Sequence, residues 1–179
     1  DIGRVRLGGP LAALSTKTVR VVASQHLGDG GFACYLDDLL VPLDYFAATE
    51  GAHRQGLLLV AIDPAKQQVE AATAFDIDSG NREAVCSRLS AKIGALLDGQ
   101  MVIVAMHGCV VGNLDALAVE ALQLLGLSIG TLQQCSLEDS YALIGSAGEV
   151  AVEQSGRIVD IATQLPLPRQ GAPRAKYFG

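Results

Sequence analysis

The chain has 179 residues, half of them hydrophobic and 18% charged, and its mean hydropathy is +0.34. This length is enough for one domain that buries about 70% of its unfolded surface without disulfide or metal staples. Residues 18–163 hold 7 basic and 18 acidic residues, so this region lacks the basic face that nucleic-acid binding requires. No run of 18 uncharged apolar residues occurs, so the sequence predicts no transmembrane helix. The share of hydrophobic residues is high for a domain without a membrane span. We attribute this excess to surface that partners cover, rather than to compositional drift toward Ala, Val and Gly.

The first half of the chain is predicted to consist of strands. Residues 1–17 show no clear period and are expected to form an arm. Strands are expected at 18–25, 32–38, 56–63 and 69–77, where β-rich, alternating or short apolar runs occur. The run at 56–63 is typical of a strand buried on both faces. The glycine-rich turn at 27–31 joins the first two strands, so its glycines do not precede a helix and are no phosphate cradle. Residues 42–55 are expected to form a loop.

The second half is predicted to contain two helices and four more strands. A helix-start cluster at 78–81 precedes apolar residues at helical spacing (Val85, Leu89, Ile93 and Leu96), which predicts a helix reaching a glycine cap at Gly99. A second helix is expected from an N-cap at Asn113 to Gly126. It carries one apolar stripe, consisting of Leu114, Leu117, Ala118, Ala121, Leu122 and Leu125. A buried strand is expected at 101–106, and short strands at 141–145, 149–154 and 157–162.

The predicted order is β-β-β-β-α-β-α-β-β-β, with helices only in the middle. This order favours an α+β fold with antiparallel edges over a doubly wound sheet, which needs helices throughout. The folded domain is expected to span residues 18–162. Residues 163–179 carry three of the six prolines and no acid, which predicts an extended basic tail rather than a core element. We expect this tail to be held by the body of the protein or by a partner.

Few residues have the spacing of a catalytic or metal site. The four cysteines are far apart and form no C-x-x-C pair, so no metal site is predicted, and buried free thiols are favoured over two disulfides: Cys34, Cys86, Cys109 and Cys135. His107 and Cys109 could pair as a nucleophile and base only if their strand continued, and Gly108 argues against this. His26 and His53 have no ligand-like partner nearby. The sequence therefore predicts no catalytic residue, no metal and no cofactor.

The stretch "CSLEDSYALIG", Cys135 to Gly145, places an acidic turn at the mouth of a buried strand. Two interpretations are open, because Glu138, Asp139 and Tyr141 could bind a ligand or could only turn the chain. We favour the turn, in which the Asp139 carboxylate accepts backbone N–H groups and residues 141–144 enter the sheet. Binding of a ligand by Asp139 and Tyr141 is the second hypothesis.

Three stretches of the chain resemble the interleukin-like EMT-inducer domain (ILEI), also called the PANDER-like domain. The first is "ACYLDDLLV" with "RQGLLLVAIDPAKQQVEAATAFDI", in which five positions match: Cys34, Gly56, Asp63, Phe75 and Asp76. The second is "LLDGQMVIVAM" with "LAVEALQLLG", and the third is the acidic stretch at 135–145, which is similar to an Arg-Asp-x-Trp segment of the family. The resemblance covers about residues 18–150. It implies a compact α+β unit of two packed sheets, sandwich-like, with two or three short helices.

Members of this family include secreted cytokine-like proteins and the stem domain of an O-mannose N-acetylglucosaminyltransferase. Sugar-binding members use an arginine and an aspartate in the third stretch, with an acidic loop after the central strand. Here Glu138 stands in place of the arginine, Asp139 is kept and Tyr141 replaces the tryptophan. The segment 107–109 replaces the acidic loop. Secreted members pair the cysteine that matches Cys34 with an upstream cysteine, and none precedes Cys34 here.

These observations predict a non-catalytic accessory or scaffold subunit that other protein subunits hold in a larger assembly, which could be membrane-associated. The expected anchors are the basic and aromatic residues near the ends: Arg4, Arg6, Arg169, Arg174, Lys176, Tyr177 and Phe178. The alternative is a carbohydrate-binding or secreted cytokine-like module, with a glycan gripped by Asp139 and Tyr141. For the compartment we favour an organelle, plastid or mitochondrion, over secretion.

Overall fold

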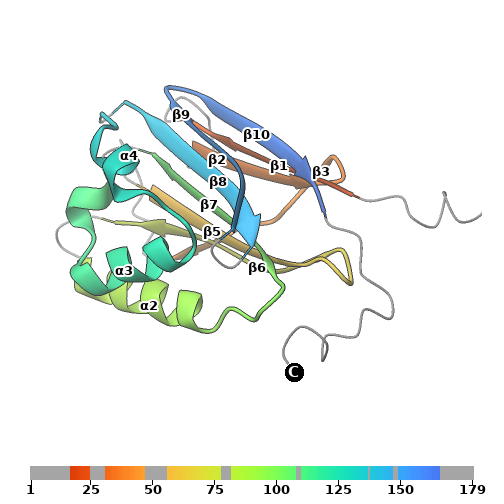
Figure 1. Cartoon of the computed structure of the whole chain (residues 1–179), viewed down its shortest axis with the longest axis horizontal. Coiled ribbons are helices and arrows are strands. Elements are labelled where there is room, and N and C mark those ends of the chain that lie inside the picture. Colours follow the sequence, from red (N-terminus) through yellow and green to blue (C-terminus); the bar gives the residue numbers. More distant parts are fainter. Residues whose placement is uncertain are drawn as a thin grey trace, which may run out of the picture.

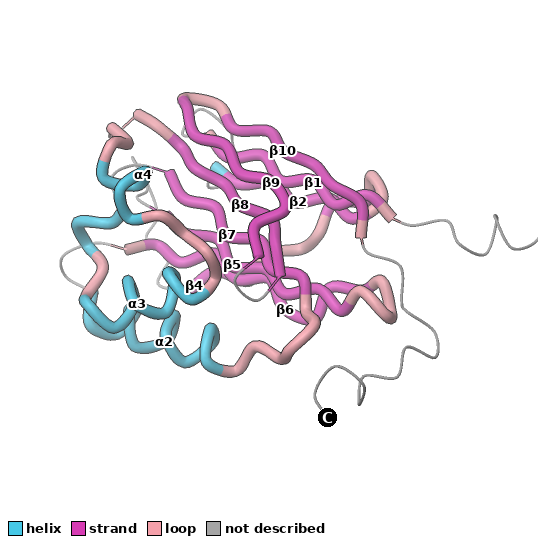
Figure 2. The backbone as a smooth tube through the Cα atoms, viewed as in Figure 1, coloured by secondary structure: helices cyan, strands magenta, loops and turns pink. Residues whose placement is uncertain are grey.

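The computed structural model describes residues 17–24, 31–46, 56–77, 82–107, 110–136, 138–146 and 149–165 of the chain. Within these residues the chain forms two β-sheets and three α-helices (Figures 1 and 2). The predicted anchors near both ends lie outside the described residues, as do Cys109, His26 and His53.

The smaller sheet has four antiparallel strands in the order β10-β1-β2-β3. Its strands are β1 (Thr18–Ala23), β2 (Phe32–Leu36), β3 (Leu39–Leu40) and β10 (Val159–Gln164). An exposed ion pair links β1 to β10, because the Arg20 guanidinium donates to both carboxylate oxygens of Asp160 at 2.8 and 2.6 Å. This pairing lowers the pKa of the Asp160 carboxyl. The same guanidinium lies over the ring of Tyr35 on β2, 5.5 Å from its centroid.

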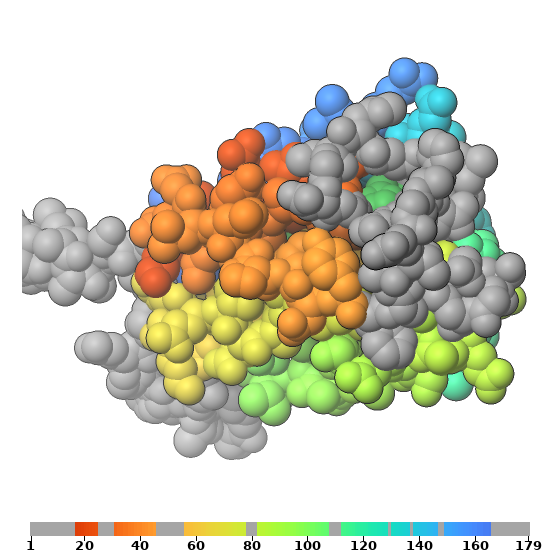
Figure 3. Space-filling view, turned by 180° about the vertical axis from the view of Figure 1, so that it is seen from behind, coloured from red at the N-terminus to blue at the C-terminus, as the bar shows by residue number. Residues whose placement is uncertain are grey.

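The larger sheet has six strands in the order β4-β6-β5-β7-β8-β9, and every neighbouring pair is antiparallel except β4 and β6. Its strands are β4 (Asp44–Phe46), β5 (Gly56–Asp63), β6 (Gln68–Asp76), β7 (Met101–His107), β8 (Ser140–Ser146) and β9 (Glu149–Gly156). The view from behind in Figure 3 shows residues 31–46 lying against residues 56–77, where β4 pairs with β6.

The three helices all lie on the same face of this larger sheet. They are α2 (Arg82–Gly94), α3 (Ala116–Leu124) and α4 (Ile129–Gln133), and a 3-10 turn at Val110–Asn113 precedes α3. Figure 1 shows α2 and α3 side by side across the sheet, on the face away from β1 and β10.

The central strands of the larger sheet are buried on both faces. Successive side chains of a strand point to opposite faces. On β5, Leu57 and Leu59 therefore join the core under the helices, whereas Leu58 and Val60 join the core shared with the smaller sheet. The strands β7 and β8 divide their side chains in the same way. Two cores on one sheet explain why these strands read as continuous apolar runs.

The strongly patterned elements agree with the sequence predictions. The strands β1, β2, β5, β6, β7, β8, β9 and β10 and the helices α2 and α3 occur where they were expected. The resulting fold is compact, two-sheeted and rich in strands, and it is consistent with the predicted sandwich-like α+β unit. Three short elements were not predicted, namely β3 and β4 near or within the expected loop and the one-turn helix α4.

Two predicted helix ends are wrong. The N-cap of α3 is Asp115 and not Asn113, because the Asp115 carboxylate accepts the Ala118 N–H at 2.8 Å. The helix α2 ends at Gly94, before the predicted cap. Gly99 does have a positive φ of 86°, but it lies in the turn that leads to β7.

The folded body extends into the predicted tail. The strand β10 continues through Gln164, and the side chain of Leu165 is buried. The Leu165 N–H also donates to the Lys17 carbonyl oxygen at 2.9 Å. The first three residues of the predicted 163–179 tail therefore belong to the fold.

We predict that alanine substitution at two glycines, Gly145 and Gly94, changes the free energy of unfolding in opposite directions. A Cβ at Gly145 would overlap the carbonyl oxygen of Glu149 at the bulge between β8 and β9, so Gly145→Ala should lower the free energy of unfolding by about 1–3 kcal/mol. A Cβ at Gly94 meets no described atom within 4 Å, so Gly94→Ala should raise it by about 0.5 kcal/mol. Urea denaturation of both variants measures these changes, and equal effects would contradict the placement of β9 against Gly145.

Candidate functional site

The acidic stretch turns the chain as predicted. The Asp139 carboxylate accepts the Ser136 N–H at 2.9 Å, and the Asp139 N–H donates to the Ser136 carbonyl oxygen at 3.1 Å. Glu138 is exposed and pairs with Arg157 on the loop after β9, at 2.9 Å. Because both side chains of this ion pair are largely exposed, it contributes little to stability.

The ring of Tyr141 is part of the core under the helices. Only 2% of the residue is exposed, and its hydroxyl donates to the Glu153 carboxylate on the neighbouring strand β9 at 2.8 Å. The pKa of the Tyr141 hydroxyl is raised well above its usual range. Burial is the larger cause, and the hydrogen bond to Glu153 is the second. Asp139 and Tyr141 are two positions apart in the sequence, and in the structure each makes a separate contact, with Ser136 and Glu153 respectively.

His107 fills the space between the two sheets at the end of β7. It is 2% exposed, and its ring centroid lies 4.5 Å from that of Phe32. A Cβ at Gly31, whose φ is +89°, would come within 2.7 Å of the imidazole, so this packing favours glycine there; a Cβ at Gly56 would come within 3.1 Å and crowd the ring. An imidazole enclosed in this way is inaccessible to a substrate.

The described cysteines, Cys34, Cys86 and Cys135, form no disulfide, in agreement with the prediction of thiols. Cys34 and Cys86 are buried, and Cys135 is partly buried. Burial raises the pKa of the Cys34 thiol to about 12, so this thiol stays protonated and unreactive at neutral pH. No three His, Cys, Asp or Glu side chains of the described residues lie close enough together to hold a metal ion.

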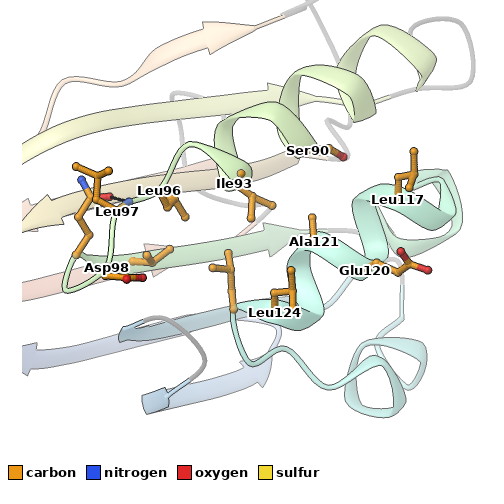
Figure 4. A pocket seen from close by; sticks show the side chains of 13 residues that line it. Ser90, Ile93, Leu96, Leu97, Asp98, Leu117, Glu120, Ala121 and Leu124 are labelled. Carbon is orange, nitrogen blue, oxygen red and sulfur yellow. Dashed lines mark hydrogen bonds between the residues drawn. The ribbon is translucent and has the colours of Figure 1, made fainter. Parts of the chain in front are cut away.

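The described surface has an open apolar groove between α2 and α3, of about 540 Å³ (Figure 4). Three of its lining leucines are strongly exposed, namely Leu97 at 70%, Leu117 at 69% and Leu124 at 75%. The side chains of Ile93 and Ala121 point into the groove from opposite helices. Exposed leucines gathered in one groove are typical of a surface that binds another apolar group.

Polar contacts of α2 hold the start of α3 in place and so fix one end of the groove. The Arg82 guanidinium donates to the Leu114 carbonyl oxygen at 3.1 Å. The Cys86 sulfur lies 3.7 Å from the Asn113 carbonyl oxygen and accepts the Asp115 N–H at 3.4 Å. At the other end, the Gln100 side chain accepts the Leu97 N–H at 2.7 Å and ties the turn that carries Leu97. The groove is therefore built in the folded chain before any partner binds.

The groove was not predicted from the sequence, because the apolar residues of the second helix form one stripe in the sequence pattern. In the structure the stripe divides. Ala118, Leu122 and Leu125 are buried against the sheet, whereas Leu117 and Ala121 face the groove together with Leu124. A helix that covers a sheet on one side needs only one apolar face. This short helix has more apolar residues than one face requires, and that excess was the sequence feature that could have indicated the groove.

Within the described residues, none of the helices has the length and apolar character needed to cross a membrane. The family model described as interleukin-like EMT inducer matches residues 55–149, which is more than half of the chain. No curated protein matches the sequence.

We predict that Tyr141→Phe lowers the free energy of unfolding at pH 7 by about 0.5–1.5 kcal/mol, because the hydrogen bond to Glu153 is lost. The raised pKa of Tyr141 contributes stability that is present below the unfolded-state pKa of about 10 and is lost as the pH rises further. Urea denaturation at pH 7 and above pH 10 should therefore show a smaller alkaline loss for Tyr141→Phe than for the unchanged chain. Tyr35→Phe, at a partly exposed ring, is the control and should change neither value. Identical alkaline losses in Tyr141→Phe and the unchanged chain would contradict the prediction.

Proposed function

We propose that this chain, which belongs to the interleukin-like EMT inducer family, is a non-catalytic accessory or scaffold subunit held in a larger protein assembly. The observation that carries the proposal is the apolar groove between α2 and α3, where three strongly exposed leucines line a preformed surface. Leaving such side chains in water costs roughly 1.5–3 kcal/mol each relative to burial, which a partner can recover.

The chemistry of the described residues supports a docking role rather than catalysis. His107 is enclosed by packing and the Cys34 thiol is buried. The groove is lined mostly by aliphatic side chains, with Asp98 and Glu120 as its only charged residues. An enzyme site usually brings a base, a nucleophile or a metal into an accessible cavity, and the groove offers apolar contact instead.

The charged ends of the chain are a second set of anchors in this proposal. They carry Arg4 and Arg6 near the start, and Arg169, Arg174, Lys176, Tyr177 and Phe178 near the end. All of these lie outside the described residues. Cationic ends suit acidic surfaces of partner subunits, which could belong to a membrane-associated complex in an organelle.

Carbohydrate binding is the alternative function that the family suggests. Sugars are recognised by exposed aromatic faces and by polar side chains that are free to hydrogen-bond. The Tyr141 ring is 2% exposed and its hydroxyl binds Glu153, and the Asp139 carboxylate accepts a backbone N–H of its own turn. Binding a glycan at this pair would therefore require both contacts to open, and for this reason we prefer the scaffold role.

We predict that removal of residues 166–179 releases the protein from its native assembly and leaves the fold intact. The cut follows Leu165, because this buried side chain belongs to the body of the protein. Gel filtration of native extracts should show the unchanged chain in a particle larger than its own 18.6 kDa. The truncated chain should elute at its own mass with an unchanged circular dichroism spectrum. A full-length chain that elutes as a monomer would refute the proposed function.

We predict that a titration of the labelled protein with mannose- and N-acetylglucosamine-containing oligosaccharides leaves its NMR spectrum unchanged. The amide signals of Asp139, Tyr141 and Glu153 should not move, because their side chains are already engaged. Saturable shifts at these three residues, abolished by Asp139→Ala, would instead establish the carbohydrate-binding alternative.

A further inference from the structure

The walls of the groove limit what can bind in it. One wall is α2 with the turn that follows it, and the other wall is α3. The backbone N–H and C=O groups of a helix hydrogen-bond to each other within the helix. The helical walls therefore expose no strand edge with which a strand of a partner could pair. Recognition must therefore come from side chains that enter between the two helices.

The groove-facing residues of α3 recur with helical spacing. Leu117, Ala121 and Leu124 are separated by four and three residues on α3. On the other wall, Ser90 and Ile93 are separated by three residues on α2, and Leu97 lies in the turn that follows this helix. Because a row at i, i+4 and i+7 is the surface that another helix packs against, the row on α3 and the apolar wall opposite it form a seat for one helix. A span of seven residues is about 10 Å long, so the seat matches about two turns.

Small residues let a partner backbone approach the groove closely. Gly94 and Ala121 both line it, from opposite walls. A Cβ built at Gly94 meets no described atom within 4 Å, so the space beside this residue is open. A side chain of the partner can fill this space without displacing the described protein.

The charge of the groove favours a bound segment of the opposite charge. Its charged lining residues are both acidic, Asp98 and Glu120, and Figure 4 shows them toward opposite ends. They belong to a region, residues 18–163, in which 18 acidic residues outnumber 7 basic ones. Electrostatic complementarity therefore favours a partner segment with Lys or Arg at both ends of an apolar face.

We infer that the groove between α2 and α3 seats an amphipathic helix of a partner protein, with apolar residues spaced i, i+3 or i+4, and i+7, flanked by basic residues. This inference rests on the proposed function and names the kind of partner at this site. The helix places its apolar face against Leu117 and Leu124, and its basic residues pair with Asp98 and Glu120.

Site-specific photo-cross-linking of the full-length protein in its native cells tests the inference. A benzophenone amino acid replaces Leu124 in the groove, and in a matched control it replaces Leu40, which is 64% exposed on the small sheet. Mass spectrometry then identifies the cross-linked peptide. We expect cross-links from the Leu124 position to a helical segment with the stated apolar spacing and basic flanks, and none from the Leu40 position.

The synthetic form of the cross-linked peptide is then titrated into the purified full-length protein. Gly94→Phe fills the open space of the groove and should weaken binding by about tenfold or more, as should Leu117→Lys. Leu40→Lys should leave the affinity unchanged. High salt should weaken binding, because part of the attraction is ionic. Each variant is checked by circular dichroism, and Gly94→Phe can be replaced by Ala121→Phe if it fails to fold.

The remaining outcomes overturn the inference. Cross-links to an extended or acidic segment, to another copy of this chain or to a lipid would each show a different occupant. Cross-links from the Leu40 position alone, or from neither position although the native particle is large, would show that the assembly uses another face. In these last two cases the proposed function survives. A native protein that elutes as a monomer removes both proposals together.

Discussion

The structure depends on the burial of the central strands β5, β7 and β8 on both of their faces. A strand alternates its side chains, so a doubly buried sheet must be covered by two separate layers. Here the small sheet covers one face and the helices cover the other. This arrangement accounts for much of the high hydropathy of the chain. Two cores on one sheet are thus a cause of the high hydropathy in addition to any surface that partners cover.

The helical layer has more apolar surface than the central sheet requires. Within α3, Leu122 is buried against the sheet, whereas Leu117 and Leu124 remain mostly exposed. The helix cannot turn these leucines inward without turning Leu122 out, since the residues lie on different faces of one cylinder. The contacts from Arg82 and Cys86 to the start of α3 also fix its position. The exposed leucines are thus a fixed feature of the fold, and burying them requires a second molecule.

The sequence predicted those elements whose pattern reflects their own burial. The apolar runs of β5 and β7 and the spacing of α2 are examples, because the sheet imposes a period that survives in the residues. The strands β3 and β4 were missed because two or three residues carry no period, and pairing with longer strands stabilises them. The turn made by Asp139 was predicted from its local hydrogen bonding. The groove was not, because a stripe pattern cannot separate an apolar face that packs inside from one that faces water.

The family match covers the groove and leaves out the charged ends of the chain. The matched region, residues 55–149, contains α2, α3 and the strands beneath them, and therefore every residue that lines the groove. It excludes β1, β2, β10 and both charged ends of the chain. Docking in the groove, as proposed, would use a surface that the matched region already holds in place, so little ordering entropy would oppose binding. Anchoring through the ends, as proposed, would use residues outside the matched region. In the proposed function the groove and the ends are therefore separate anchors, one built on the family-matched body and the other outside it.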